Sequence, residues 1–250
     1  MSQQTRVAII TGGSRGIGRA VALALGKRGY IVCFGYHSNE KAAAEVIAGI
    51  KAAGGTAAAV RCDVGNEADI LSLFKKADSL GPLGVLVNNA GIVAPSIRLD
   101  EMSTGRFQRL MAVNVVGSLI CAREAVRRMS TRHGGQGGAI VNLSSMAATL
   151  GGANTYIDYA ASKGAIDTMT IGLAREVANE GIRVNAIRPG LIDTEIHASG
   201  GDGARLERLK PTVPMQRIGT ATEVANAVVW LISDEASYVT GTIFDVSGGR

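Results

Sequence analysis

The sequence is poor in the residue types on which most metal, redox and nucleic-acid sites depend. Aromatic residues make up only 4% of its 250 residues, and there are three histidines and three cysteines. Cys33, Cys62 and Cys121 lie far apart and form neither a CxxC motif nor a Cys/His cluster, and the histidines also lack ligand spacing. We therefore expect reduced, mostly buried thiols and no metal site.

Long hydrophobic runs and a signal-peptide pattern are absent as well. No apolar run approaches the ~20 residues that a membrane-spanning helix needs. Residues 1–6 have no signal-peptide pattern and lead directly into a strand-like run. We therefore expect a cytoplasmic protein that does not contact a membrane.

Positive charge is in excess, but it is not arranged as nucleic-acid binding requires. The net charge is +5, the basic residues are scattered and stacking aromatics are scarce, so we expect no nucleic-acid partner. The nearest basic cluster consists of Arg123, Arg127, Arg128 and Arg132. We interpret this cluster as a solvated helix face, with an acidic or phosphorylated ligand as the alternative.

The sequence does contain a regular alternation of short strand-like runs and longer helical stretches. Its 46% hydrophobic and 19% charged residues are typical of a globular protein, and its length suits one domain over residues 1–250. Strands are predicted at residues 7–10, 31–34, 57–61, 85–87, 139–142, 182–187 and 243–246. Helices are predicted at residues 17–28, 40–53, 67–79, 100–112, 113–130, about 157–179 and 221–233. This alternation predicts an α/β fold in which about seven strands form a doubly wound parallel sheet with helices on both faces.

Tyr159 and Lys163 are four residues apart in a predicted helix and therefore share one face of it. Free tyrosine has a pKa of about 10 and is a poor proton carrier at neutral pH. Because a nearby cation favours the phenolate, we expect Lys163 to lower the pKa of Tyr159 within a cleft. The alternative is a surface tyrosine and lysine on an amphipathic helix.

A glycine-rich turn, Thr11-Gly12-Gly13-Ser14-Arg15-Gly16-Ile17-Gly18, follows the first predicted strand and opens the first helix. Glycines at such a turn let the backbone approach a pyrophosphate, which then lies at the positive end of the helix. No Lys-Ser/Thr pair follows the last glycine, so the turn is not a P-loop. The spacing T-G-x-x-x-G-x-G also differs from the standard G-x-G-x-x-G. The turn predicts a dinucleotide site.

Three motifs in this order resemble those of the short-chain dehydrogenase/reductase family: T-G-x-x-x-G-x-G, the run Asn88-Asn89-Ala90-Gly91 after the fourth strand, and Y-x-x-x-K at Tyr159. The resemblance covers nearly the whole chain, because further family positions follow in order: Asp63, Asn114, Asn142-Leu143-Ser144-Ser145, Pro189-Gly190 and Gly241. It implies a single Rossmann-type domain, a nicotinamide cofactor and a homotetramer. The branches that it most resembles are the 3-oxoacyl-acyl carrier protein reductases and the glucose dehydrogenases.

The resemblance implies four catalytic residues: Asn114, Ser145, Tyr159 and Lys163. Tyr159 would exchange a proton with the substrate, Lys163 would lower its pKa and hold the nicotinamide ribose, and Ser145 would bind the substrate oxygen. Asn114 would hold a water that links the lysine to solvent. The alternative for Asn114 is a buried structural residue with satisfied hydrogen bonds.

Two neighbouring residues compete for these roles. Ser144 is the alternative to Ser145. In the family that the chain resembles, the second serine of such a run is usual and lies some thirteen residues before the tyrosine. Ser145 comes nearer to this spacing than Ser144 does, so we prefer Ser145. Tyr156 is the alternative to Tyr159, but the residue four positions beyond it is Ala160, not lysine. We therefore expect Tyr156 to form a wall of the substrate pocket.

The end of the second strand favours NADP(H) over NAD(H). An enzyme that selects NAD places an acid there to bind the ribose 2′-OH. This sequence has Tyr36, His37 and Ser38, with no acid before Glu40, and Arg15 is suited to a 2′-phosphate. The full set of expected cofactor-binding residues is Gly12, Ser14, Arg15, Gly16, Ile17, Gly18, Tyr36, His37, Ser38, Asp63, Val64, Asn88, Ala90, Gly91, Tyr159, Lys163, Pro189, Gly190, Ile192 and Thr194.

We therefore expect an NADP(H)-dependent oxidoreductase that transfers a hydride between nicotinamide and a carbonyl or secondary alcohol. A substrate lid is expected at residues 191–215. Helices 113–130 and 157–179 and the run 238–249 are expected to form the homotetramer interfaces.

The substrate and the class of function have alternatives. The substrate is a 3-oxoacyl group on acyl carrier protein, or a sugar or polyol. Glu180 stands where carrier-specific reductases often have a basic residue, which weakens the carrier interpretation. A regulator that binds NADPH without catalysis is a different class of function. It would need a broken set of catalytic residues, whereas all four are present.

Overall fold

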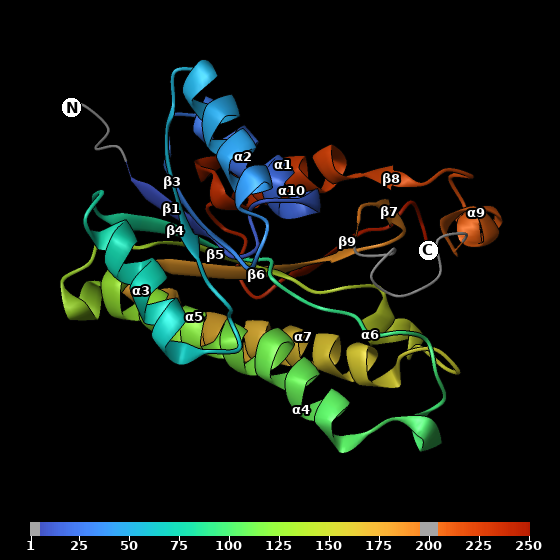
Figure 1. The fold of residues 1–250 in the computed structure, drawn as a ribbon. Coiled ribbons are helices and arrows are strands. Elements are labelled where there is room, and N and C mark those ends of the chain that lie inside the picture. The colour runs from blue at the N-terminus through green and yellow to red at the C-terminus, as the bar shows by residue number, and fades with distance from the viewer. Residues whose placement is uncertain (1–5, 196–204) are drawn as a thin grey trace.

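The structure is a computed structural model that describes residues 6–195 and 205–250. Figure 1 shows a twisted sheet between two layers of helices. The sheet consists of β1 (Val7–Ile10), β2 (Ile31–Tyr36), β3 (Thr56–Arg61), β4 (Leu83–Asn88), β5 (Gly138–Leu143), β6 (Ile182–Pro189) and β9 (Ile243–Val246). One layer consists of α1 (Gly16–Lys27), α2 (Glu40–Ala52) and α10 (Ala221–Ile232). The other consists of α3 (Glu67–Asp78), α4 (Thr104–Met111), α5 (Gly117–Met129) and α7 (Ile157–Val177).

The strand order is β3-β2-β1-β4-β5-β6-β9, and every neighbouring pair is parallel. β1 pairs with β2 on one side and with β4 on the other, so the order reverses at β1. Sheets of this kind bind ligands at such a switch point, beyond the carboxyl ends of the strands. The predicted doubly wound, seven-stranded parallel sheet is confirmed.

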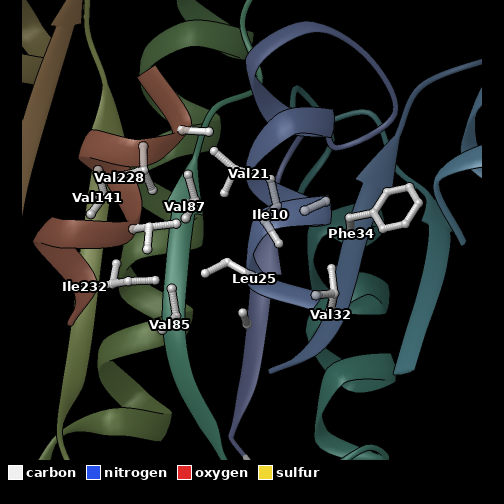
Figure 2. Packing of buried hydrophobic residues seen from close by; sticks show 14 of the residues in the cluster. Ile10, Val21, Leu25, Val32, Phe34, Val85, Val87, Val141, Val228 and Ile232 are labelled. Carbon is white, nitrogen blue, oxygen red and sulfur yellow. The ribbon is translucent and has the colours of Figure 1, made fainter. Parts of the chain in front are cut away.

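Each face of the sheet has its own hydrophobic core. On one face, α1, α2 and α10 pack on the strands, and Figure 2 shows Leu25 and Val21 of α1 beside Val87 and Ile10 of the sheet. On the other face, α3, α5 and α7 form the second cluster, with Phe74 as its largest side chain. Because both faces are covered, all four residues of β1 are buried and apolar, as is usual for a central parallel strand.

Several boundaries differ from the sequence prediction. β2 continues through Tyr36, because Gly35 and Tyr36 still pair with β3. The two helices predicted at 100–112 and 113–130 follow each other without a break, since a π-helical turn, Ala112–Val116, joins α4 to α5. Around the carboxyl end of the sheet lie short elements that the sequence patterns did not predict: α6 (Ala147–Leu150), β7 (Ile192–Asp193), α9 (Arg205–Leu209) and β8 (Gly219–Thr220). Within the described ranges, no helix is both long and apolar enough to span a membrane.

Candidate active site

A cleft of about 740 Å³ opens at the carboxyl ends of the strands, where the strand order reverses. This volume lies within the range of small-molecule sites. Of the residues predicted to act in catalysis or cofactor binding, those that line the cleft are Gly12, Ser14, Arg15, Gly16, Ile17, His37, Ser38, Asp63, Val64, Ala90, Gly91, Ser145, Tyr159, Lys163, Pro189, Gly190, Ile192 and Thr194. The fold therefore brings together residues from both halves of the chain.

The glycine turn between β1 and α1 forms one wall of this cleft. Gly12 has a φ of +66°, which disfavours any residue with a side chain. A Cβ on Gly18 would lie 2.2 Å from the carbonyl oxygen of Gly12, so only glycine fits there. The N-cap residue of α1, Arg15, makes no capping hydrogen bond with its side chain, and the first turn contains no acidic residue. The positive end of α1 is thus available to an anion such as a pyrophosphate.

Asn89 fixes the glycine turn against the end of β4. Its side-chain amide donates to the carbonyl oxygens of Thr11 and Gly12, at 2.9 and 3.0 Å. The hydroxyl of Thr11 in turn accepts the backbone N–H groups of Asn89 and Ala90. Sequence reasoning missed this role of Asn89, although the run Asn88-Asn89-Ala90-Gly91 was the available signal.

Four of the predicted site residues lie outside the cleft lining within the described part of the chain: Gly18, Tyr36, Asn88 and Asn114. The amide of Asn88 instead donates to Asn142 Oδ1 at 3.0 Å and to the carbonyl oxygen of Ser118 at 3.2 Å. Asn142 donates to the hydroxyl of Thr170, at 2.9 Å. Asn88 therefore joins β4 to β5 and α5 in the interior, and Asn142 continues the series to α7. The neighbouring Asn89 faces the cleft.

The end of the cleft beside β2 combines polar and charged side chains. Arg15, His37 and Ser38 line it. Asp63 lies next to them and is bonded to Arg109 at 2.8 Å. Burial opposes the ionisation of Asp63, but hydrogen bonds from the Gly65 N–H and from Arg109 keep its pKa below the ordinary value. The charge of Asp63 is therefore compensated by the protein itself.

Lys163 lines the cleft from the second turn of α7. It is 4% exposed, and its ammonium donates to the carbonyl oxygen of Leu143 at 2.7 Å. Burial lowers the pKa of Lys163 to about 8, although the carboxylate of Asp167, one turn further on, acts in the opposite direction. The ammonium lies 5.6 Å from the centre of the Tyr159 ring.

The pKa of Tyr159 differs from the sequence expectation. Burial raises the pKa of Tyr159 above its ordinary value, and a hydrogen bond with Ser145 acts against that rise. The expected lowering of this pKa by Lys163 is not found in this structure. The physical reason is that the phenol is buried, while the ammonium of Lys163 is directed to Leu143.

The two serines at the end of β5 have different surroundings. Ser144 is 4% exposed and donates its hydroxyl hydrogen bond to the carbonyl oxygen of Lys163, which fixes the helix backbone. Ser145 is hydrogen-bonded to Tyr159 and accepts the N–H of Ala147. Ser145 thus lies beside the phenol, where a substrate oxygen would also bind.

Asn114 sits in the π-helical turn and is 1% exposed. Its Oδ1 accepts the N–H of Ile92 at 2.8 Å, and its Nδ2 donates to the Ile92 carbonyl oxygen and to the Ser162 hydroxyl. These bonds match the structural alternative for Asn114. They join the loop after β4 to the helix that carries Tyr159 and Lys163.

The remaining walls come from the expected lid and from Tyr156. The ring of Tyr156 meets that of Tyr159 edge-on, with ring centres 5.7 Å apart, and lines the cleft. Of the predicted lid, 191–215, residues 196–204 lie outside the described residues. In the described part, Leu191, Thr194 and Leu209 line the cleft.

The arginine cluster on α5 is compensated by carboxylates. Arg123 bonds to Glu67 and Glu124, Arg127 to Glu124, and Arg128 to Asp78 and Glu124. Arg132 lies 4.0 Å from Glu180. These pairs fit the interpretation of the cluster as a solvated face better than that of a site for an acidic partner.

Known proteins similar to this chain were found by sequence and by structure. Residues 12–250 match the family described as enoyl-(acyl carrier protein) reductase. The chain is 52% identical over 245 residues to the uncharacterized oxidoreductase YgfF of Escherichia coli K12, covering 98% of this chain and 99% of the relative. It is 40% identical over 246 residues to glucose 1-dehydrogenase 2 of Bacillus subtilis 168, covering 98% and 94%. A short-chain dehydrogenase from Burkholderia cenocepacia in complex with NADP has a TM-score of 0.90 at 33% identity, covering 98% and 97%.

Proposed function

The chain belongs to the short-chain dehydrogenase/reductase family, and from this premise we propose that it is an NADP(H)-dependent enzyme that interconverts a carbonyl compound and a secondary alcohol. One observation carries the proposal. Tyr159, hydrogen-bonded to Ser145 and adjacent to Lys163, lies in the cleft that begins at the glycine turn. This arrangement supports the proposal of a proton donor beside a dinucleotide site.

In the proposed reduction, Tyr159 donates its hydroxyl proton to the carbonyl oxygen of the substrate. Ser145 donates a hydrogen bond to the same oxygen as negative charge develops on it. When bound, the nicotinamide supplies the hydride that forms the new C–H bond. In the reverse direction, Tyr159 accepts the alcohol proton.

Lys163 supports the charge that Tyr159 carries after it has given up its proton. With a pKa of about 8, Lys163 is mainly cationic at pH 7. The low-polarity surroundings of the cleft strengthen its attraction for the phenolate. Because Ser144 and Leu143 hold the backbone and the ammonium of Lys163, the cation stays in place during the proton transfer.

The residues present fit a dinucleotide cofactor. Gly12, Gly16 and the open N-terminus of α1 would hold the pyrophosphate. Asp63 and Val64 would contact the adenine, and Ala90 and Gly91 would flank its ribose. Pro189, Gly190, Ile192 and Thr194 would hold the nicotinamide side.

We propose NADP(H) as the cofactor because the end of β2 has no acid for a ribose 2′-OH and Arg15 and His37 line that end of the cleft. The NADP complex of the Burkholderia cenocepacia dehydrogenase supports this choice. Dissociation constants for NADPH and NADH, measured by quenching of protein fluorescence, test it. Tighter binding of NADH would contradict the proposal.

We propose a small carbonyl or polyol substrate in preference to an acyl carrier protein. The compensated arginines of α5 and the position of Glu180 beside Arg132 favour this choice, and a glucose dehydrogenase is among the relatives. NADPH oxidation should be followed with ketones, sugars and a carrier-linked 3-oxoacyl substrate. Preference for the carrier-linked substrate would overturn this assignment. Tight NADPH binding without turnover of any substrate would favour the regulator instead.

We also propose a homotetramer in which α5 and α7 form one interface. Val116, Leu119 and Ile171 expose large apolar side chains there, and a groove between the two helices includes Met169 and Leu173. Light scattering on the purified protein should give four times the chain mass of 25.8 kDa. A monomer mass would reject the assembly. The cytoplasmic location stays a prediction from the sequence.

A further inference from the structure

Arg106 of α4 contacts two segments that lie directly behind cleft-lining residues, the start of α7 and the loop after β4. Its Nε and Nη2 donate to the two carboxylate oxygens of Asp158, at 2.7 and 3.1 Å. Its Nη1 donates to the carbonyl oxygen of Pro95 at 2.6 Å. The side chains of Arg106 and Asp158 are only 11% and 4% exposed. A shielded pair with two parallel bonds fixes the geometry of both partners more tightly than an exposed pair does.

Asp158 connects this pair to the proposed proton donor. It precedes Tyr159 in the first turn of α7, and its Oδ1 also accepts the backbone N–H of Tyr159, at 2.9 Å. A carboxylate in the first turn is further favoured by the positive end of the helix. The carboxylate held by Arg106 therefore holds the turn from which the Tyr159 side chain extends.

Pro95 connects the same arginine to the loop after β4. It lies in the loop after β4, from which Ile92, Val93 and Ser96 line the cleft. A second bond, from the Ile97 N–H to the carbonyl oxygen of Thr155 at 3.0 Å, joins this loop to the segment before α7. Arg106 thus fastens the loop and the start of α7 to each other.

We propose that Arg106 and Asp158 are positioning residues, which set the Tyr159 hydroxyl at a fixed place relative to the loop wall against which a substrate carbonyl binds. This inference rests on the proposed function. A misplacement of about 1 Å between reacting groups costs on the order of 10²-fold in rate. The opposing view is that the pair stabilises the fold and does nothing else.

The test compares Arg106→Met with Arg98→Met in the full-length protein. Arg98 is a matched control, because it pairs with Asp100 at 3.1 Å near the same loop but is 65% exposed. Arg106→Met should lower kcat by roughly 10- to 100-fold and leave the NADPH dissociation constant within about twofold of wild type. With NADPH deuterated at the transferred position, the isotope effect on kcat should rise, since hydride transfer becomes rate-limiting. The control should match wild type in all three measurements.

A second variant keeps the test usable if Arg106→Met folds poorly. Removal of the arginine alone leaves the Asp158 carboxylate buried and unpaired, which is destabilising. Arg106→Met combined with Asp158→Asn removes that charge and retains an oxygen for the Tyr159 N–H. The double variant should regain stability but keep the low kcat. Arg106→Lys, which retains the charge without the paired bonds, should fall between wild type and Arg106→Met.

The outcomes separate this inference from the proposed function. If the wild-type protein turns over a carbonyl compound and the double variant has the same kcat and isotope effect as wild type, the positioning role alone is overturned. No turnover by the wild-type protein with any carbonyl compound overturns the proposed function, and the positioning role with it.

Discussion

The face of the sheet under α1 and α10 and the face under α5 and α7 are buried to a similar degree but differ in what fills them. Where α1 and α10 meet the sheet, aliphatic side chains such as Leu25 and Val228 interlock, as Figure 2 shows. Under α5 and α7, buried polar side chains are bonded in series from Asn88 through Asn142 to Thr170. Lys163 lies on this second face and is 4% exposed.

This difference shows which face of the sheet holds the site residues in place. Aliphatic packing tolerates rearrangement of individual side chains as long as volume is kept. A buried hydrogen-bond series has few alternative arrangements, because each polar group that loses its partner carries a desolvation cost. The polar series therefore helps to hold Tyr159 and Lys163 at defined places, while the hydrophobic cores on both faces supply the driving force for folding.

Lys163→Met should have a large effect on activity and should act on stability in the opposite direction. Loss of the cation should lower kcat by on the order of 10³-fold, because Tyr159 loses support for its charged form. The pKa of Lys163 is about 8 when folded and 10.5 when unfolded, so burying its charge costs roughly 3 kcal/mol at pH 7. The variant should therefore melt at a higher temperature than wild type.

The pH dependence follows with a defined sign. Between pH 8 and 10.5 the unfolded chain still binds the Lys163 proton that the folded protein has released, so the contribution of Lys163 to wild-type stability should rise with pH in this window. The buried cysteines, whose pKa values are raised, contribute in the opposite direction above about pH 9. Lys163→Met should lack the Lys163 contribution. Thermal melts of both proteins from pH 7 to 10 check it. A variant that melts below wild type at pH 7, or one that stays active, speaks against this account.

Leu25→Ala should destabilise the packing of the aliphatic face without changing catalysis. Leu25 is fully buried between α1 and the sheet, so the substitution should cost about 2–5 kcal/mol of unfolding free energy. The kcat of the folded fraction should stay within about twofold of wild type, because the polar face is unchanged. Urea unfolding and steady-state kinetics at low temperature measure the two quantities. A large drop in kcat would mean that the two faces are coupled.

Arg15→Ala sharpens the comparison at the N-terminus of α1, where the aliphatic face reaches the cleft. Loss of a charge-assisted contact to a 2′-phosphate should weaken NADPH binding roughly tenfold, or about 1.4 kcal/mol, and leave NADH binding almost unchanged. Arg19→Ala, one turn further along α1 and outside the cleft lining, is the control. Equal losses for both cofactors would remove Arg15 from the proposed 2′-phosphate site.

Asn66→Ala should have the smallest effect. Asn66 caps α3 by accepting the N–H of Ala68 at 2.9 Å, and loss of this cap should cost about 1 kcal/mol of stability. α3 lies on the same face as α7 but apart from the polar series, so kcat should not change. Chemical unfolding and kinetics on the same preparation test both parts. An activity loss here would show that the whole face, and not the polar series alone, supports the site.

The sheet could be predicted from sequence because its signals are local. Strand runs, helix stops at Gly29 and Gly54, and the glycine turn each need only a few neighbouring residues to be recognised. The pairing of Tyr159 with Lys163 is local as well, since a single helix turn separates them. These features are fixed by short-range geometry, which the sequence displays directly.

The parts that were missed depend on contacts between distant segments. The bond between Arg106 and Asp158 spans 52 positions, and Asn89 reaches back 78 positions to Thr11. The raised pKa of Tyr159 arises from burial, which no local spacing reveals. The π-helical turn was missed because its residues, 112–116, contain neither glycine nor proline, so no local signal interrupts the helical pattern there.

The most direct test of the central claim is the kinetics of Tyr159→Phe, which removes one hydroxyl from the buried site and keeps the ring. We predict that kcat/KM for the best carbonyl substrate falls by about 10³-fold or more, while the NADPH dissociation constant stays within about twofold of wild type. A Phe variant that turns over at near the wild-type rate would contradict the assignment of Tyr159 as the proton donor.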